Sequence, residues 1–201
     1  VLGLNHAKTA ILVVLVNPRA GGLLISGPRG IGKSTLMRST QELIERPWRD
    51  IPVSITEDRL FGTIDTEKAI YSGQKKLYPG IINEADQGVL YLDDVNLLRE
   101  DLLDSILDIA EVGMYQLERD GLSLRCDTSF TVIAAINPES GMLSGACLDQ
   151  FGLFVNVDNI HDENTRVEIL KRTISFEKDC ASFCNLWKLE NEKIKKAIHS
   201  A

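Results

Sequence analysis

Hydrophobic positions along this chain follow two patterns, stretches with helical spacing and short runs that are almost entirely apolar. Apolar residues in 5–16 and 101–110 recur with the spacing of one helix face, so we expect helices there. Short apolar runs are typical of strands that are covered on both faces, and they lie at 23–25, 89–92, 131–136 and 153–157. Helices that alternate with such strands predict an α/β fold with a mostly parallel sheet.

Weaker patterns fill the stretches between these segments. A helix is expected from Ser34 to about Glu45, and Pro79-Gly80 marks a turn. The β-branched stretch 51–55 is either a second strand or an extended approach to the next turn. Additional short or C-terminal helices are expected at 66–71, 143–150, 163–175, 177–185 and 189–199, with Asp162 as an N-cap.

A β-hairpin is expected at 111–125, where the helical spacing breaks. Tyr115 and Leu117 alternate with polar neighbours, and Leu122 and Leu124 alternate on the return. Asp120-Gly121 between them is a dipeptide typical of tight hairpin turns. The alternation therefore predicts two antiparallel strands inserted after the helix at 101–110.

The segment from Gly27 to Ser34 fits the phosphate-binding pattern G-x-x-x-x-G-K-[ST]. Glycines let the backbone approach a phosphate closely, and the N-terminus of the following helix points its N–H groups at negative charge. A chance match on a glycine-rich turn is the alternative, which the flanking strand and helix disfavour. The residues expected to bind the phosphates of ATP are Gly27, Pro28, Arg29, Gly30, Ile31, Gly32, Lys33, Ser34 and Thr35.

Within this loop, Lys33 is expected to reach the β- and γ-phosphates and the Ser34 hydroxyl to bind Mg²⁺. Asp93 and Asp94 follow the apolar run 89–92, at the strand end where an open α/β sheet places its ligands. Asp93 is expected to hold Mg²⁺ with Ser34, directly or through water, and Asp94 to orient the attacking water. A solvated acidic turn is the alternative for this pair.

Asn137 follows the next buried run and should lie beside the two aspartates. Its amide could then bond the γ-phosphate or the attacking water, which makes it a catalytic candidate together with Asp94 and Lys33. Asn137-Pro138 is also a common turn dipeptide, and the two interpretations are compatible.

The composition of the chain disfavours several classes of protein. The chain has 201 residues, 44% of them hydrophobic, and no apolar run approaches the roughly 20 residues of a membrane helix, so we expect a cytoplasmic protein without a membrane partner. Its net charge of −7 disfavours a nucleic-acid partner. Four scattered cysteines complete no zinc pattern, and buried reduced thiols are expected instead.

Several strings then resemble the AAA+ subunits of magnesium chelatase over about residues 3–172. Beside the phosphate loop, they are ITEDR at 55–59, GTID at 62–65, PG at 79–80, GVLYLDDVNLL at 88–98, ERDGLSLR at 118–125, NPE at 137–139 and LDQFGL at 148–153. Phosphate loops are widespread, whereas the other strings in this order are far more specific.

The resemblance implies a P-loop NTPase of the AAA+ type, with a three-layer αβα core around a mostly parallel five-stranded sheet. It implies a nucleotide-binding domain at 1–160, a helix-2 hairpin insert at about 113–126, and the start of an incomplete helical lid at 161–201. It further implies a ring-forming ATPase, homo- or hetero-hexameric, that uses Mg-ATP to drive metal insertion into a tetrapyrrole by a separate large catalytic subunit.

Three positions depart from the family pattern. Asp94 stands where the family's motor subunit usually has glutamate, which withdraws the carboxylate by about 1.5 Å. Ser144 and Gln150 replace both arginines of the family's GELRPQLLDRFGL string. Because an arginine that reaches a neighbour's γ-phosphate is worth roughly 10³ to 10⁵ in rate, we expect weak ATPase activity from this chain alone.

Two other functions remain open. One is a non-hydrolysing platform subunit of the same kind of complex, which the replaced arginines and the short 46–52 connection favour. The other is a DNA-directed AAA+ motor, which the negative charge and the ITEDR string disfavour.

Overall fold

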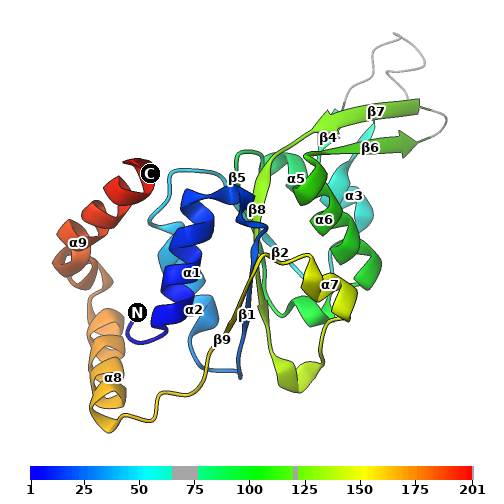
Figure 1. Ribbon diagram of the computed structural model, residues 1–201. Helices are drawn as coiled ribbons and strands as arrows, with labels where there is room; N and C mark the ends of the chain where they lie inside the picture. Colours follow the sequence, from blue (N-terminus) through cyan, green and yellow to red (C-terminus); the bar gives the residue numbers. More distant parts are fainter. Residues whose placement is uncertain (65–76, 120–121, 201) are drawn as a thin grey trace.

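The computed structural model describes residues 1–64, 77–119 and 122–200, and Figure 1 shows a central sheet with helices on both faces. Within these ranges, five strands form the sheet in the order β2-β5-β8-β1-β9, and every neighbouring pair is parallel. Their bounds are β1 Leu23–Ser26, β2 Trp48–Ile51, β5 Gly88–Leu92, β8 Phe130–Ile136 and β9 Leu153–Asn156. The predicted three-layer α/β fold is confirmed.

Helices cover the two faces of the sheet in separate groups (Figure 1). One face carries α1 (Asn5–Val16) and α2 (Lys33–Gln41). The other carries α3 (Glu57–Phe61), α5 (Ile81–Glu84), α6 (Glu100–Val112) and α7 (Gly145–Asp149). Short 3₁₀ turns follow α1, β5 and β8 at Pro18–Ala20 (η1), Val95–Leu97 (η2) and Pro138–Ser140 (η3).

Alternate side chains of the central strands divide between two hydrophobic cores. In β1, Leu23 and Ile25 pack with the core under α1 and α2, whereas Leu24 packs with the core under α6. Every residue of β1, β5 and β8 is buried. Burial on both faces explains why these strands have short apolar runs instead of alternating polar and apolar residues.

Two boundaries differ from the sequence-based expectation. The second strand lies at Trp48–Ile51, where it pairs with β5 from Trp48↔Val89 to Ile51↔Leu92. Of the two alternatives for 51–55, the strand is therefore wrong, because residues 52–55 form no strand. Pro52 has no N–H to donate to a ladder, so pairing stops before it. Helix α2 ends at Gln41 instead of near Glu45, and the Leu43 N–H bonds back to Thr40 O (2.9 Å) in a tightened final turn.

The predicted hairpin is present as β6 (Met114–Arg119) and β7 (Leu122–Asp127), which pair antiparallel. Gly113, with φ +78°, ends α6 and lets the chain turn into β6. A second antiparallel pair joins β3 (Gly62–Ile64) to β4 (Leu77–Pro79). The predicted helix at 66–71 and the Asp120-Gly121 turn lie outside the described residues.

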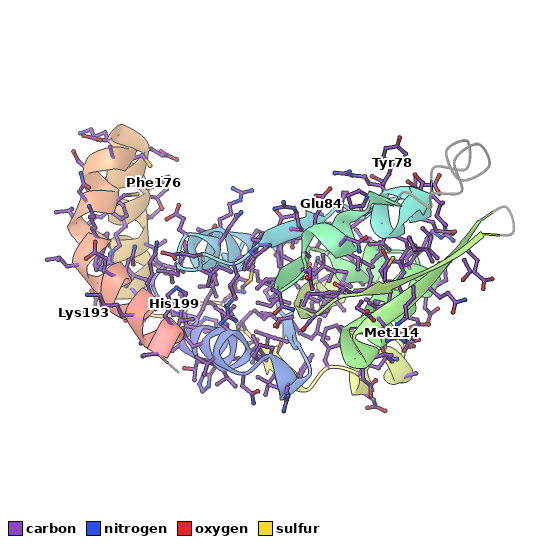
Figure 2. All side chains as sticks on the ribbon, turned by 90° about the horizontal axis from the view of Figure 1, so that it is seen from above. Tyr78, Glu84, Met114, Phe176, Lys193 and His199 are labelled. Atoms are coloured by element: carbon purple, nitrogen blue, oxygen red, sulfur yellow. The ribbon has the colours of Figure 1, made fainter. Side chains whose placement is uncertain are left out.

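Two helices, α8 (Glu163–Lys178) and α9 (Cys180–Ser200), take the place of the three predicted at the C-terminal side. Asp162 is the N-cap of α8, as predicted, because its Oδ2 accepts from the Thr165 N–H at 2.8 Å. Figure 2 shows these helices and the β6-β7 hairpin at opposite ends of the molecule. None of the described residues of α8 is buried.

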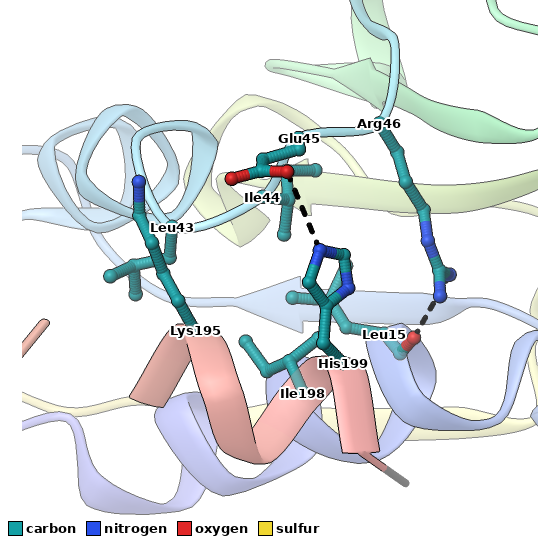
Figure 3. Close-up of a pocket in the computed structure, with 8 residues that line it drawn as sticks. All are labelled: Leu15, Leu43, Ile44, Glu45, Arg46, Lys195, Ile198 and His199. Carbon is teal, nitrogen blue, oxygen red and sulfur yellow. Dashed lines mark hydrogen bonds and ion pairs between the residues drawn. The ribbon is translucent and has the colours of Figure 1, made fainter. Parts of the chain in front are cut away.

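The end of α9 returns to the body of the protein beside α1 and the α2–β2 connection (Figure 3). Ile198 is buried there, and His199 Nε2 lies 3.5 Å from Glu45 Oε2. Arg46 donates to the Leu15 carbonyl at 3.3 Å. The pocket that these residues line has a volume of about 10 Å³, room for about one water molecule. It is therefore a packing junction and not a nucleotide site.

Candidate nucleotide site

Glycines in the loop between β1 and α2 serve two different purposes. A Cβ at Gly27 would meet Val157 Cγ2 at 2.5 Å and Val157 O at 2.6 Å, so this glycine permits close packing. Gly30 and Gly32 have φ of +78° and +97°, and a Cβ on either would meet none of the described residues within 4 Å. These two positions combine the left-handed backbone that favours glycine with open space above the loop.

Lys33 opens α2 and points its ammonium back into the loop. Its Nζ donates to Gly27 O at 2.5 Å and to Pro28 O at 3.0 Å, and the residue is 7% exposed. Burial lowers the pKa of Lys33, although the nearby charges of Asp94 and Asp93 oppose this effect. A buried cation beside an open glycine loop is the arrangement that a phosphate chain requires.

Ser34 and Asp93, predicted to share a metal ion, are in direct contact. Ser34 lies in the first turn of α2 and Asp93 directly follows β5, and Ser34 Oγ donates to Asp93 Oδ2 at 2.9 Å. Asp93 Oδ1 accepts the Asp94 N–H at 3.2 Å. A hydroxyl and a carboxylate oxygen are the hard ligands that Mg²⁺ prefers.

Asp94 stands beside the loop in a left-handed backbone conformation, with φ 47° and ψ 49°. Aspartate is among the few non-glycine residues that tolerate this region. Its Oδ2 lies 3.7 Å from Arg29 Nη2, and both side chains are substantially exposed, so this ion pair contributes little to stability. The carboxylate is thus accessible beside the phosphate loop.

Asn137 directly follows β8, which pairs with β5, so it lies one strand away from Asp93 as predicted. Its side chain is 1% exposed and bonds within its own turn. Oδ1 accepts the Glu139 N–H at 3.2 Å and Nδ2 donates to Ser140 Oγ at 3.0 Å. The turn interpretation of Asn137-Pro138 is therefore observed, and a bond from this amide to a phosphate stays a prediction.

The remaining loop residues continue along the same edge of the sheet. Pro28 and Ile31 are partly buried, whereas Thr35 is exposed in the first turn of α2. The two positions that match arginines in the resembling family lie at the ends of α7. Ser144 is the N-cap of α7, where its Oγ accepts the Cys147 N–H at 3.3 Å, and Gln150 is the exposed C-cap residue after Asp149.

Tyr91 also borders this site, although sequence reasoning assigned no role to its hydroxyl. Its ring lies 6.0 Å from the Trp48 ring, centroid to centroid, and the residue is packed into the core with 6% exposure. Its hydroxyl, however, is buried without a hydrogen-bond partner among the described residues. Strand alternation could have placed Tyr91 near this site. Alternate positions of a strand share a face, and Tyr91 is two residues before Asp93.

The cysteines do not form a second functional site among the described residues. Cys126 and Cys147 are buried, but Cys180 and Cys184 are exposed on α9 with their sulfurs 4.0 Å apart, so the expectation of buried thiols is wrong for this pair. Among the described residues there is no cluster of three or more metal-ligating side chains. No helix among the described residues has both the length and the apolar composition of a membrane-spanning segment.

The chain is similar to known proteins of one family. Residues 22–150 match the family described as AAA domain (dynein-related subfamily). The chain is 34% identical to the magnesium-chelatase 38 kDa subunit of Cereibacter sphaeroides, over all of this chain and 70% of that one. It is 33% identical to the magnesium-chelatase subunit ChlI homolog of Methanocaldococcus jannaschii, over all of this chain and 65% of the relative.

A solved structure gives the same result. The matching chain belongs to a complex between subunits BchI and BchD of magnesium chelatase, with a TM-score of 0.71 and 34% identity over 96% of this chain and 71% of that one. This chain spans about two thirds of the length of the relatives that it matches. From its phosphate loop, its sheet order and these identities, the chain belongs to the AAA+ subunits of the magnesium-chelatase family.

Proposed function

We propose that this chain binds Mg-ATP between the β1–α2 loop and the end of β5. Hydrolysis of the ATP drives metal insertion into a tetrapyrrole by a separate, larger catalytic subunit. The observation that carries the proposal is the 2.9 Å bond from Ser34 Oγ to Asp93 Oδ2 beside the open glycines. The substrate and the partner subunit follow from the relatives' names and from the resemblance in sequence.

The residues of the site fit a magnesium nucleotide. Gly30 and Gly32 leave open the space that a Cβ would occupy, and α2 directs its N-terminus there. Ser34 and Asp93 would hold Mg²⁺, which, when bound, neutralises charge on the phosphates. Loop residues Gly27 to Thr35 would surround the phosphate chain.

Three side chains of this protein would act on the bound nucleotide. Lys33 exchanges the Gly27 and Pro28 carbonyls for β- and γ-phosphate oxygens, which are stronger acceptors because they are charged. Asp94 orients the attacking water from its exposed position beside the loop. Asn137 bonds the γ-phosphate or this water, for which its amide must leave the Ser140 hydroxyl.

Activity would depend on neighbouring subunits in a ring. Ser144 and Gln150 stand where the family has arginines, and a neutral amide cannot stabilise the charge that develops during phosphoryl transfer as an arginine does. We infer that this chain hydrolyses ATP slowly until a partner AAA+ subunit supplies that arginine. Residues 1–160 would form the nucleotide-binding domain, and 161–201, with α8 and α9, belong to a helical lid.

Binding of a fluorescent ATP analogue and single-turnover hydrolysis test the proposal together. We expect Mg²⁺-dependent binding by the chain alone, slow turnover, and faster turnover after addition of a relative's subunit that retains the arginine. Absence of nucleotide binding would contradict the proposal. Binding with unchanged turnover in the presence of the partner would instead favour the non-hydrolysing platform subunit.

The platform function is the second candidate, and the exposed neutral Gln150 at the end of α7 favours it. A DNA-directed motor is a third and weaker alternative, because the net charge of −7 repels a phosphate backbone on average. Salt-sensitive binding of DNA by the purified chain would support the motor over both chelatase functions.

A further inference from the structure

The Tyr91 hydroxyl is a buried polar group that the proposed chemistry has not used. It is fully enclosed and has no hydrogen-bond partner among the described residues. Leaving a buried donor unsatisfied costs free energy, so such groups in a folded protein need an explanation. Elsewhere in the same chain a tyrosine hydroxyl is satisfied, because Tyr115 Oη lies 2.6 Å from Asn83 Oδ1 and 2.7 Å from Phe61 O.

The surroundings of the hydroxyl point to Asp93 as its partner. Tyr91 and Asp93 occupy alternate positions along β5 and its end, so they face the same side of the sheet, towards α2. The Asp93 carboxylate reaches this side as well, because its Oδ2 accepts from Ser34 Oγ in the first turn of α2. Asp50 is paired with Tyr91 in the β2–β5 register, but its Oδ1 already accepts from Trp48 Nε1 at 2.8 Å.

Asp93 can accept another hydrogen bond. Its Oδ2 accepts from Ser34 Oγ and its Oδ1 accepts from the Asp94 N–H, so each oxygen uses one of its two lone-pair directions. The Tyr91 ring is held by its packing against Trp48, so it presents the hydroxyl from a fixed position. A rigidly held donor near a carboxylate is suited to orienting that carboxylate.

We propose that Tyr91 is a positioning residue for Asp93, and that its hydroxyl donates to this carboxylate when Mg-ATP is bound. This inference rests on the proposed function, because it assigns Tyr91 to the same metal site. In the structure, the Asp93 carboxylate is oriented by Ser34 and the Asp94 amide. Ser34 and Asp93 would hold the cation, and the bond from Tyr91 would keep the Asp93 carboxylate in the orientation that this requires.

The test is a Mg²⁺ titration of binding of a fluorescent, non-hydrolysable ATP analogue to Tyr91→Phe. Because a hydrogen bond to a charged group is stronger than one between neutral groups, we expect the half-saturating Mg²⁺ concentration to rise by about tenfold. Affinity measured in EDTA should not change. Tyr115→Phe is the matched control, since it removes the same atom from another buried tyrosine and should leave the Mg²⁺ dependence as in the wild type.

A second variant shows whether the effect passes through Asp93. In an Asp93→Asn background, Tyr91→Phe should cause no further change in Mg²⁺ dependence, because the two residues act as one unit. Additive effects, an unchanged titration, or an equal loss of affinity in EDTA would overturn the proposal. So would failure of Tyr91→Phe to fold, which would mean that the hydroxyl supports the nucleotide-free fold.

The same data separate this inference from the proposed function. A wild-type chain that binds the analogue only with Mg²⁺, together with an unaltered Tyr91→Phe titration, contradicts the role of Tyr91 alone. A wild-type chain that binds no nucleotide at any Mg²⁺ concentration contradicts the nucleotide site itself, and the role of Tyr91 with it.

Discussion

Ser34 and Asp93 are 59 positions apart in sequence, yet Ser34 Oγ donates to Asp93 Oδ2 at 2.9 Å. The parallel arrangement of β1, β8 and β5 produces this contact, because it brings the β1–α2 loop and the end of β5 to the same edge of the sheet. Ligand sites of open α/β sheets lie at this edge, beyond the carboxyl ends of the strands.

Removing either partner of this pair should weaken metal binding. We expect Ser34→Ala and Asp93→Asn each to reduce Mg²⁺ affinity in the presence of nucleotide by roughly tenfold to hundredfold. Ser39→Ala is a matched control, because its hydroxyl donates to Thr35 O at 2.9 Å farther along the same helix. Equal Mg²⁺ titrations of all three variants would exclude this pair as the metal site.

Lys33 should be required for nucleotide affinity more than for folding. Replacing Lys33 by alanine removes its charge-assisted contacts to the phosphates. We therefore expect the affinity for the ATP analogue to fall by about a hundredfold. Arg38→Ala in the same helix should keep wild-type affinity. Calorimetric titration with the non-hydrolysable analogue measures the affinity of both variants. Similar losses of affinity in the two variants would indicate general electrostatic attraction and not a specific role of Lys33.

A new arginine at the end of α7 should restore turnover. Gln150 is exposed, so Gln150→Arg adds the side chain without removing a side-chain hydrogen bond or ion pair among the described residues. We expect single-turnover hydrolysis to accelerate by at least tenfold in self-assembled protein. Gln150→Lys supplies charge without the planar guanidinium and should accelerate it less. Rapid hydrolysis by the wild type would contradict the missing-arginine account.

Ser144→Arg is a less direct test of the same idea. Ser144 Oγ caps α7 by accepting the Cys147 N–H, so this substitution also costs about 1 kcal/mol of helix stability. We expect a lower Tm for Ser144→Arg than for Gln150→Arg. Thermal unfolding of both variants at equal concentration distinguishes the loss of the cap from the effect of the added charge.

The length of the side chain at Asp94 should limit the rate of hydrolysis and not the affinity for nucleotide. Misplacing a catalytic group by about 1 Å can cost on the order of 10²-fold, so Asp94→Glu should raise single-turnover rates and Asp94→Asn should lower them. Both should bind the ATP analogue as the wild type does. The left-handed backbone at this position makes a small loss of Tm in Asp94→Glu an expected side effect.

The two buried tyrosines should differ in stability tests without nucleotide. Tyr115→Phe loses a satisfied hydroxyl and leaves Asn83 Oδ1 without this donor, so we expect a loss of about 1 kcal/mol in the free energy of unfolding. Tyr91→Phe removes an unpaired hydroxyl and should be neutral or slightly stabilising. Urea unfolding measures both, and a large loss in Tyr91→Phe would reveal a partner for its hydroxyl.

Local patterns were sufficient to predict most of the architecture. Strands such as 131–136 are buried on both faces, so their sequences are apolar throughout, and this property is visible without a structure. The phosphate loop is equally local, because consecutive residues produce its backbone geometry. The hairpin followed from alternation in 114–119 and 122–127.

Errors occurred where neighbours in space decide the outcome. Trp48 belongs to β2 because Val89 is available to pair with it, which the propensities of residues 48–55 do not reveal. Cys180 and Cys184 are exposed because α9 contacts the body of the protein mainly near Ile198. Such contacts depend on segments that are distant in the chain.

Sequence alone therefore identifies the kind of fold, the loop for phosphates and the acidic pair, because each depends on residues that are close together in the chain. Only the folded chain determines that Ser34 contacts Asp93, that the Asn137 amide turns to Ser140, and that the Tyr91 hydroxyl is buried without a partner in the described part of the chain. Strand order and side-chain packing create these relationships. Both arise from contacts between segments that are far apart in the sequence.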